Sequence, residues 1–254
     1  MSPRSLPGPA PASGGDGGSL PRETTEPAAH PAFTRPAPAQ PTAQPTAQPT
    51  AVWLVRHGES TWNIAGLCQG HNDEAELTER GLRQAADAAA QFGYRPVRAI
   101  YASDLRRAQQ TAAEFAAVLG LPVHTDPRLR ERRLGVLEGT PHAAIGPSDL
   151  GHDGERLFAP DTRPAGGESV RDLYRRAAGF CDDLAAGLRD DRDTLPGLTE
   201  RDGDVLVIAH GGTVRVLEAY IRGIPVDQMT WRPVDNATIV RIPEFGRQSR
   251  GENR

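Results

Sequence analysis

The chain has 254 residues, a formal net charge of −4 at pH 7 and no block of acidic or basic residues, so neither nucleic acid nor an anionic membrane surface is expected as a partner. All 29 basic side chains are arginines, which excludes sites built on a phosphate-loop, Schiff-base or kinase lysine. No run approaches the roughly 20 apolar residues of a membrane-spanning helix, and a signal peptide's apolar core is missing. We therefore expect a soluble, cytoplasmic protein.

Residues 1–50 are expected to form a disordered tail. They consist mainly of Pro, Ala, Gly, Ser and Thr, with Ala-Gln-Pro-Thr repeated near the end. Proline removes a backbone donor, and the stretch has too little apolar surface to offset the entropy lost on ordering. The rest of the chain is long enough for one α/β domain, expected over residues 51–245, followed by a frayed tail at 246–254.

The first predicted strand, residues 51–55, is an apolar run that stops at Arg56, His57 and Gly58. Such a run followed by glycine is typical of a buried parallel strand that opens into a loop. In open α/β sheets, ligands bind at the carboxyl ends of strands. An arginine fork could hold a phosphate there and an imidazole nitrogen could attack it, which indicates phosphoryl transfer. From this stretch alone, a loop arginine beside a solvated histidine is an equal alternative.

The next elements alternate between helices and strands. Residues 63–76 are polar and aperiodic, so we predict an irregular loop. A helix is predicted to begin at Thr78, its N-cap, and a short strand follows at residues 99–102. A second helix, with Ser103 as its expected cap, should end at Gly120. A strand again leads directly into a polar turn and a helix, as at the first strand.

The middle of the chain is predicted to carry the least regular structure. Residues 129–162 are rich in glycine and proline, so we expect a long loop with at most short helical turns. Long ordered loops usually act as lids or binding segments, and this one is expected to lie over the site. A helix is predicted over residues 170–189, and the charged, turn-rich residues 190–203 connect it to the next strand.

A second buried strand, residues 204–209, ends at His210, Gly211 and Gly212, much as the first ends at its arginine and histidine. A helix at residues 213–221 and a last strand at 238–242 complete the pattern. Strands that alternate with helices predict a mainly parallel sheet covered on both faces. Histidine, arginine and glycine thus recur at strand ends that should share one edge of this sheet.

Four motifs, taken in chain order, resemble those of the histidine phosphatase superfamily, also called the phosphoglycerate mutase-like family. They are Arg56-His57-Gly58-Glu59, Ser103-Asp104-Leu105-x-Arg107-Ala108-x-Gln110-Thr111-Ala112, Leu129-x-Glu131 and His210-Gly211. The resemblance extends over residues 51–243. It implies a three-layer α/β/α sandwich and a metal-independent phosphatase, without a cofactor, that hydrolyses phosphomonoesters of small metabolites through a phosphohistidine.

The same resemblance assigns the principal roles. It makes His57 the histidine that is phosphorylated, and His210 the second catalytic histidine, which binds phosphate and stabilises charge. Arg56 and Arg107 are expected to bind the equatorial phosphate oxygens. The helical pattern does not distinguish Arg106 from Arg107, but the spacing in the motif favours Arg107. Nearby arginines should keep the nucleophilic imidazole neutral.

Further residues are expected to line the phosphate site. Asn63 matches an asparagine that donates to a phosphate oxygen, and Gln69-Gly70 resembles a motif of the phosphatase branch. Gly211 would let the backbone approach an anion at a helix N-terminus. Leu137 stands where the family usually has tryptophan, a departure that should alter the substrate rim.

A carboxylic acid must protonate the leaving alkoxide. Glu131 occupies the family's acid position, although arginines surround it in sequence, and Glu138 is the rival. The two cysteines, Cys68 and Cys181, are expected to be free, buried thiols.

Three other functions are alternatives to a phosphatase. A phosphoglycerate mutase-type phosphotransferase would need an insert with paired arginines and a proline run, which residues 138–167 lack. An inactive phospho-ligand-binding module would need a lost core residue. A zinc hydrolase would need a helical His-x-x-x-His pair. The sequence does not indicate the oligomeric state, and it does not name the substrate.

Overall fold

The computed structural model describes residues 50–145, 156–190, 195–198 and 202–245. Contacts divide the chain into a unit from Met1 to Gln44 and a unit from Pro45 to Arg254. The described residues all belong to the second unit. The predicted tails at residues 1–49 and 246–254 lie outside them.

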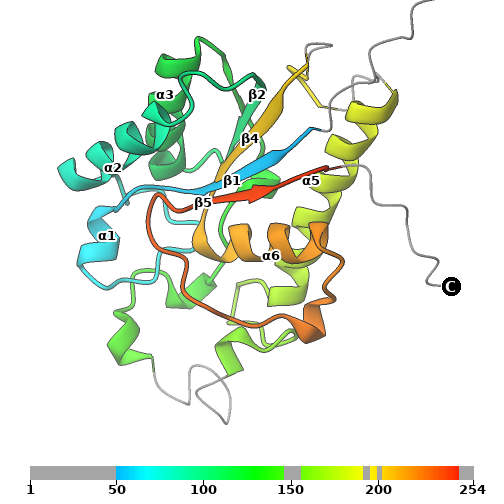
Figure 1. Ribbon diagram of the computed structural model, residues 1–254. Coiled ribbons are helices and arrows are strands. Elements are labelled where there is room, and N and C mark those ends of the chain that lie inside the picture. Colours follow the sequence, from blue (N-terminus) through cyan, green and yellow to red (C-terminus); the bar gives the residue numbers. More distant parts are fainter. Residues whose placement is uncertain (1–49, 146–155, 191–194, 199–201, 246–254) are drawn as a thin grey trace, which may run out of the picture. The chain divides into compact units, whose positions relative to one another are not determined.

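The centre of the second unit is a five-stranded sheet in the order β3-β2-β4-β1-β5 (Figure 1). Its strands are β1 (Val52–Arg56), β2 (Val97–Ala102), β3 (Val123–Thr125), β4 (Asp204–Ala209) and β5 (Ile239–Ile242). Strand β4 pairs in parallel with β1 and β2, and β2 pairs in parallel with β3. Only β5 runs antiparallel, along β1. The prediction of a mainly parallel sheet is confirmed.

Helices cover both faces of this sheet. They are α1 (Thr61–Ile64), α2 (Glu79–Ala90), α3 (Arg106–Leu119), α5 (Val170–Asp190) and α6 (Gly211–Ile221). Helices α2 and α3 lie over one face, and α5 and α6 over the other (Figure 1). Side chains of β1 alternate between these layers: Trp53 and Val55 pack with α2 and α3, whereas Val52 and Leu54 pack with α5 and α6. The predicted three-layer α/β/α sandwich is confirmed.

Several predicted element boundaries hold. Helix α2 begins after Thr78, whose hydroxyl accepts a hydrogen bond from Gly81 N at 2.9 Å, and α3 ends at Gly120 with a φ of 64°. A 3₁₀ turn, η1 (Pro127–Leu129), leads into the long loop. The described parts of that loop contain the 3₁₀ turns η2 (Gly135–Leu137), η3 (His142–Ala144) and η4 (Arg156–Phe158), and an isolated bridge pairs Pro141 with Leu67. A further turn, η5 (Val226–Gln228), precedes the last strand.

Two local predictions are wrong. The polar loop after the first strand starts with α1, in which Ser60 and Asn63 form a capping box. A helix of four residues is too short to produce a hydrophobic period. Ser103 does not cap α3, because that helix begins at Arg106 after Leu105. The Ser103 hydroxyl instead lies 2.8 Å from His210 Nε2.

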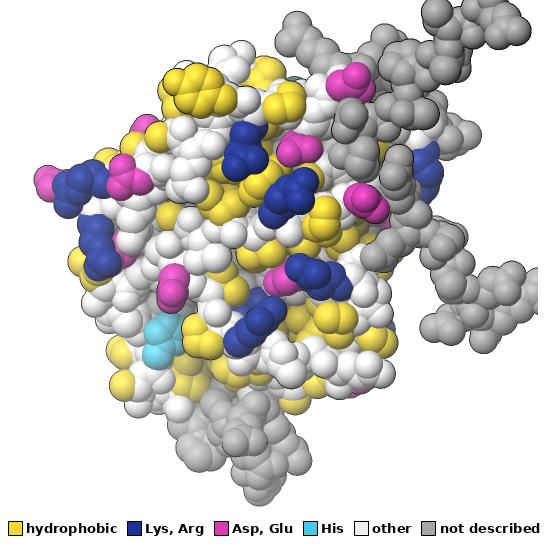
Figure 2. All heavy atoms as spheres, in the orientation of Figure 1, with side chains coloured by type: hydrophobic (Ala, Val, Ile, Leu, Met, Phe, Trp, Pro, Cys, Tyr) yellow, Lys and Arg dark blue, Asp and Glu magenta, His cyan; other side chains and the backbone are white. Residues whose placement is uncertain are grey.

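The surface carries charges of both signs. Figure 2 shows basic, acidic and hydrophobic side chains interspersed over the face that it presents. None of the helices within the described ranges is long and apolar enough to cross a membrane.

Candidate active site

A pocket opens where β1 and β4 end, and it gathers most of the predicted site. Its lining includes every predicted site residue except His210, namely Arg56, His57, Asn63, Gln69, Gly70, Arg107, Glu131 and Gly211. His210 is fully buried behind this lining, and its ring centroid lies 5.1 Å from that of His57. The chain thus brings together residues that are up to about 150 positions apart because three parallel strands end at one edge.

His57 presents one ring nitrogen to the pocket in a defined protonation state. Its Nδ1 lies 2.7 Å from the carbonyl oxygen of Gly58. A carbonyl can only accept, so Nδ1 carries the proton and Nε2 keeps a free lone pair. Burial lowers the pKa of His57 well below its ordinary value, and the charges of Arg107 and Arg56 lower it further. The imidazole is therefore neutral and nucleophilic at pH 7.

His210 is a second neutral imidazole. Its Nε2 is 2.8 Å from the Ser103 hydroxyl, and its Nδ1 is buried without a hydrogen-bond partner among the described residues. Burial is the main reason why the pKa of His210 lies well below 6.5, and Arg107 and His57 add to the effect. A buried ring nitrogen without a partner is costly, and a ligand oxygen that reached this atom would offset that cost.

Two arginines provide the positive charge. Arg107 is fully buried, and its Nη1 and Nη2 donate to the carbonyl oxygens of Asn72 at 2.8 Å and Gly70 at 2.9 Å. Arg56 Nη1 donates to Val234 O. In both side chains Nε is buried and has no hydrogen-bond partner among the residues that the structure describes. Burial lowers the pKa of Arg107 to about 10 and also lowers that of Arg56, yet both remain charged at pH 7.

The two adjacent arginines at the start of α3 point in different directions. Arg106 points to solvent and forms an ion pair with Glu76 at 2.8 Å, whereas Arg107 points into the pocket. Arg107 is thus the arginine that lines the pocket, and its role in binding phosphate stays a prediction.

Glu131 is held at the N-terminus of α6. Its Oε2 accepts from Gly212 N at 2.8 Å, and its Oε1 accepts from Arg132 N at 2.7 Å. A Cβ at position 212 would come within 2.3 Å of Oε1, so glycine is required there for the carboxylate to approach. At Gly211, by contrast, a Cβ would make only ordinary contacts.

Glu138, the rival acid, has a different task. Its Oε1 accepts hydrogen bonds from His71 N at 3.0 Å and from Leu134 N at 2.9 Å. The carboxylate thus connects the loop that contains His71 to the loop that contains Leu134. It does not line the pocket. Leu137 does not line it either, but it packs against Leu157, which does. The geometry favours Glu131 as the carboxyl group that can meet a ligand.

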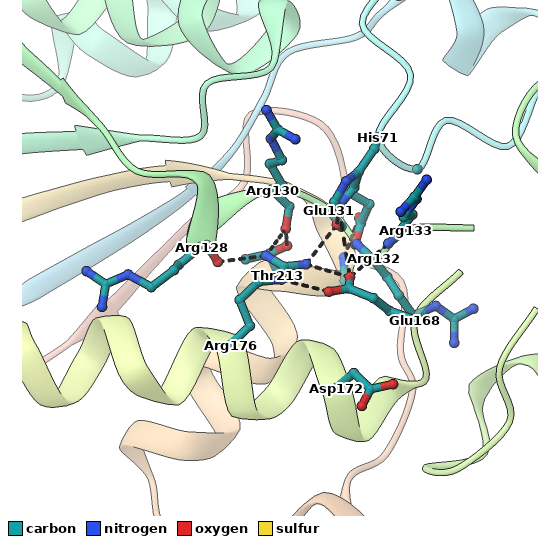
Figure 3. A network of polar contacts seen from close by, with 12 residues as sticks. His71, Arg128, Arg130, Glu131, Arg132, Arg133, Glu168, Asp172, Arg176 and Thr213 are labelled. Carbon is teal, nitrogen blue, oxygen red and sulfur yellow. Dashed lines mark hydrogen bonds and ion pairs between the residues drawn. The ribbon is translucent and has the colours of Figure 1, made fainter. Parts of the chain in front are cut away.

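The segment that carries Glu131 is fixed from behind by α5 (Figure 3). Arg176 donates to the carbonyl oxygens of Arg128 at 2.8 Å, Arg130 at 2.9 Å and Glu131 at 3.0 Å. Its guanidinium also forms two hydrogen bonds, at 2.9 and 2.8 Å, to the carboxylate of Glu168. One arginine thus satisfies three carbonyls of an irregular loop and fixes its path.

Asn236 is a site residue that sequence reasoning missed. Its Nδ2 donates to the carbonyl oxygens of His57 at 3.2 Å and Gly58 at 3.2 Å, and to Asn63 Oδ1 at 3.1 Å. Because the oxygen of Asn63 is occupied in this way, and also accepts from Ser60, its amide NH₂ is the end left for a ligand. No local pattern marks Asn236, which precedes the last strand.

The outer part of the pocket also contains residues that were not predicted. They are Leu67, Cys68, Arg132, Leu134, His142, Leu157, Phe158, Arg215 and Trp231. Cys68 Sγ lies 3.2 Å from His142 Nδ1, and burial raises the pKa of its thiol to about 11, so the thiol is neutral. Cys68 and Cys181 are both free and buried, as predicted.

The described residues contain no group of three or more His, Cys, Asp and Glu side chains that could hold a metal ion.

Comparison with known proteins places this arrangement in context. The sequence model of the histidine phosphatase superfamily (branch 1) matches residues 52–250. Glucosyl-3-phosphoglycerate phosphatase of Mycobacterium tuberculosis is 38% identical over 176 residues, which cover 68% of this chain and 75% of that protein. A probable phosphoglycerate mutase, GpmB, of Yersinia pestis is 34% identical over 202 residues, covering 75% of this chain and 83% of that protein.

A solved structure is similar over the same region. The structure of mycobacterial glucosyl-3-phosphoglycerate phosphatase in complex with VO3 has a TM-score of 0.65 and 32% sequence identity. The alignment covers 76% of this chain and 92% of that one.

Proposed function

The chain belongs to the histidine phosphatase superfamily, and from this premise we propose that it is a metal-independent phosphatase that hydrolyses phosphomonoesters of small metabolites through a phosphohistidine on His57. The observation that supports this best is the state of His57. Its Nε2 has a free lone pair at neutral pH. The charges of Arg56 and Arg107 act on this imidazole, and neither arginine forms an ion pair with a carboxylate within the described residues.

In the first step, the phosphate dianion binds to Arg56 and Arg107, and its remaining oxygens accept hydrogen bonds from the Asn63 amide and from the Nδ1–H of His210, whose Nε2 accepts from Ser103. His57 Nε2 attacks phosphorus while the ester P–O bond breaks. The guanidinium groups stabilise the charge on the equatorial oxygens. The leaving alkoxide takes a proton from the carboxyl group of Glu131.

In the second step, the carboxylate of Glu131 removes a proton from a water molecule, which attacks phosphorus as the P–N bond breaks. Inorganic phosphate leaves, and the neutral imidazole of His57 and the carboxylic acid of Glu131 are restored. Two displacements through a covalent intermediate replace one difficult step.

The relatives suggest where to begin the search for the substrate. Glucosyl-3-phosphoglycerate is the first candidate, because a relative that is 38% identical is named for it. The proposed compartment is the cytoplasm, and the two free thiols support it because free thiols are usual in a reducing environment. Phosphate release from glucosyl-3-phosphoglycerate, 3-phosphoglycerate and generic phosphomonoesters tests this function. No release from any of them would refute it.

A mutase is the second candidate, because the relative from Yersinia pestis is named a probable phosphoglycerate mutase. A mutase returns the phosphoryl group to another hydroxyl of the substrate, whereas a phosphatase passes it to water. Interconversion of 2- and 3-phosphoglycerate faster than phosphate release would favour the mutase.

Activity is expected to survive removal of divalent metals. With arginines as the charge stabilisers, EDTA should change the rate of phosphate release by less than about twofold. Vanadate, which adopts the trigonal-bipyramidal geometry of the transition state, should inhibit at concentrations well below KM. Both effects can be measured with p-nitrophenyl phosphate. Loss of activity in EDTA that is restored by added metal would contradict the role given to the arginines.

The Arg176→Met variant is expected to lower kcat for alkyl phosphates by roughly 10- to 100-fold, because Glu131 would shift relative to the leaving oxygen. The loss should be smaller for p-nitrophenyl phosphate, whose leaving group needs no proton.

Arg175→Met is the matched control, since the neighbouring Arg175 side chain is 70% exposed and forms an ion pair with Asp172 at 3.6 Å. A purely structural Arg176 would lower the melting temperature and slow both substrates equally.

A further inference from the structure

Four side chains form one wall of the outer pocket. Phe158, in η4, stacks on Trp231 with ring centroids 4.7 Å apart and an interplanar angle of 26°. Arg132 lies over the Phe158 ring at 5.9 Å from Cζ to centroid, and Arg215 lies over the Trp231 ring at 4.7 Å. All four line the pocket. We call this group the outer wall.

Neither arginine of the outer wall forms an ion pair within the described residues, and the carboxylate charge that acts most strongly on each of them is that of Glu131. Arg132 donates to Leu157 O and Arg215 to Arg232 O, and neither has a carboxylate in ion-pair contact within the described part of the chain. Burial lowers the pKa of both, but a guanidinium stays protonated at pH 7. An aromatic face holds a cation without neutralising it, so the positive potential remains directed at the pocket.

The pocket therefore holds more positive charge than one phosphate requires. Arg56, Arg107, Arg132 and Arg215 all line it, whereas Glu131 is its only lining carboxylate among the described residues. A phosphomonoester carries at most two negative charges. When Glu131 is protonated to act as an acid, the phosphate leaves two guanidinium charges without a partner. Buried charges without partners are costly, and a second anion would reduce that cost.

The position of Arg215 indicates where the second anion would lie. A Cβ built on Gly211 would be 3.5 Å from Arg56 Nε and 3.6 Å from Arg215 Nη1. Arg215 thus adjoins an arginine of the phosphate end, and Arg132 follows Glu131 directly in sequence. A group bound there would be only a few bonds away from the phosphate.

We propose that the outer wall is a second-anion subsite, in which Arg132 and Arg215 bind a carboxylate carried by the phosphomonoester, and Phe158 and Trp231 hold these arginines in place. The enzyme would thereby select phosphorylated hydroxy acids over neutral phosphomonoesters. This inference rests on the proposed function for the phosphate end of the pocket.

Two ligands that differ at a single group test the proposal. 3-Phosphoglycerate and glycerol 3-phosphate have the same phosphate, and one has a carboxylate where the other has a hydroxymethyl group. Their Kd values would be measured by calorimetry on the His57→Ala variant, which cannot turn them over. We expect 3-phosphoglycerate to bind roughly 10- to 100-fold more tightly.

In the same background, Arg215→Gln and Arg132→Gln should each reduce this preference by about tenfold and leave glycerol 3-phosphate binding within about threefold. Trp231→Leu should reduce it by roughly 3- to 10-fold, and Trp231→Phe should restore part of it. Arg222→Gln is the control, because Arg222 pairs with Glu218 and does not line this pocket. It should leave both Kd values unchanged.

Equal affinity for the two ligands would overturn the proposal. The proposal would also fail if neither Arg215→Gln nor Arg132→Gln reduced the preference for 3-phosphoglycerate. It would fail as well if Arg215→Gln weakened the binding of both ligands equally. Because binding is the readout, the result does not depend on turnover. If the protein bound 3-phosphoglycerate more tightly but the unmodified enzyme released no phosphate, the proposed phosphatase function would be refuted and the proposed second-anion subsite would stand.

Discussion

Replacement of His57 by alanine is expected to lower kcat/KM for phosphomonoesters by roughly 10⁴-fold or more, because the covalent route loses its nucleophile. Asn236 and the backbone of β1 would still hold the loop, so the fold should persist. Steady-state phosphate release measures the loss, and circular dichroism with thermal melting checks the fold.

His124→Ala is the control for this variant. His124 lies on β3, outside the pocket, and should be dispensable for turnover. A His57→Ala protein that is folded and retains more than about 1% of activity would mean that another group attacks phosphorus.

Replacement of Glu131 by glutamine is expected to lower kcat for alkyl phosphates by about 10²- to 10⁴-fold, the usual range for loss of a general acid. The glutamine oxygen can still accept from Gly212 N, but its NH₂ would then face Arg132 N, so thermal melting must accompany the kinetics to show that the fold is retained. For p-nitrophenyl phosphate, whose leaving group departs without a proton, formation of the intermediate should be nearly unaffected. Burst kinetics with the aryl ester and steady-state rates with an alkyl ester separate the two steps.

Glu138→Gln provides the comparison. A glutamine oxygen at position 138 can still accept from His71 N and Leu134 N, so this variant should keep near-normal kcat values for both esters. If the dependence on the leaving group appeared in Glu138→Gln and not in Glu131→Gln, the acid would be Glu138.

The order of strands and helices could be predicted because it follows from local patterns. Apolar runs that stop at Arg56 and at His210 marked the ends of β1 and β4, and the cap at Thr78 and the glycine at position 120 marked helix boundaries. The motif residues could be placed on one sheet edge because parallel strands align their carboxyl ends. Arg107 could be preferred over Arg106 only through the spacing of its motif.

The residues that were missed act through contacts between distant segments. Arg176 supports the Glu131 segment from a helix about 45 positions away, and Asn236 reaches the His57 loop across about 180 positions. On α5, Arg176 looks like any surface arginine, because its carbonyl partners belong to an irregular loop without a period. Such contacts leave no local signal.

The failed cap at Ser103 has a related cause. A serine that precedes a helical pattern usually caps it, but here the chain continues for two more residues and the hydroxyl turns to His210 instead. A buried imidazole nitrogen needs a partner, and this requirement of the site prevailed over the local preference. The outer wall could not be predicted from the sequence either, because its stacked rings, Phe158 and Trp231, belong to segments that are far apart in the chain.

The central claim is that phosphorus is transiently bonded to the imidazole at position 57 while arginines stabilise the charge. The most direct test is to mix the enzyme with a phosphomonoester labelled in its phosphate, quench in alkali during the first turnover, and map the label by peptide mass spectrometry. Phosphohistidine is stable to alkali and labile to acid. The account predicts an acid-labile label on His57 that turns over at the rate of phosphate release. A label on any other residue, or no covalent label during turnover, would contradict it.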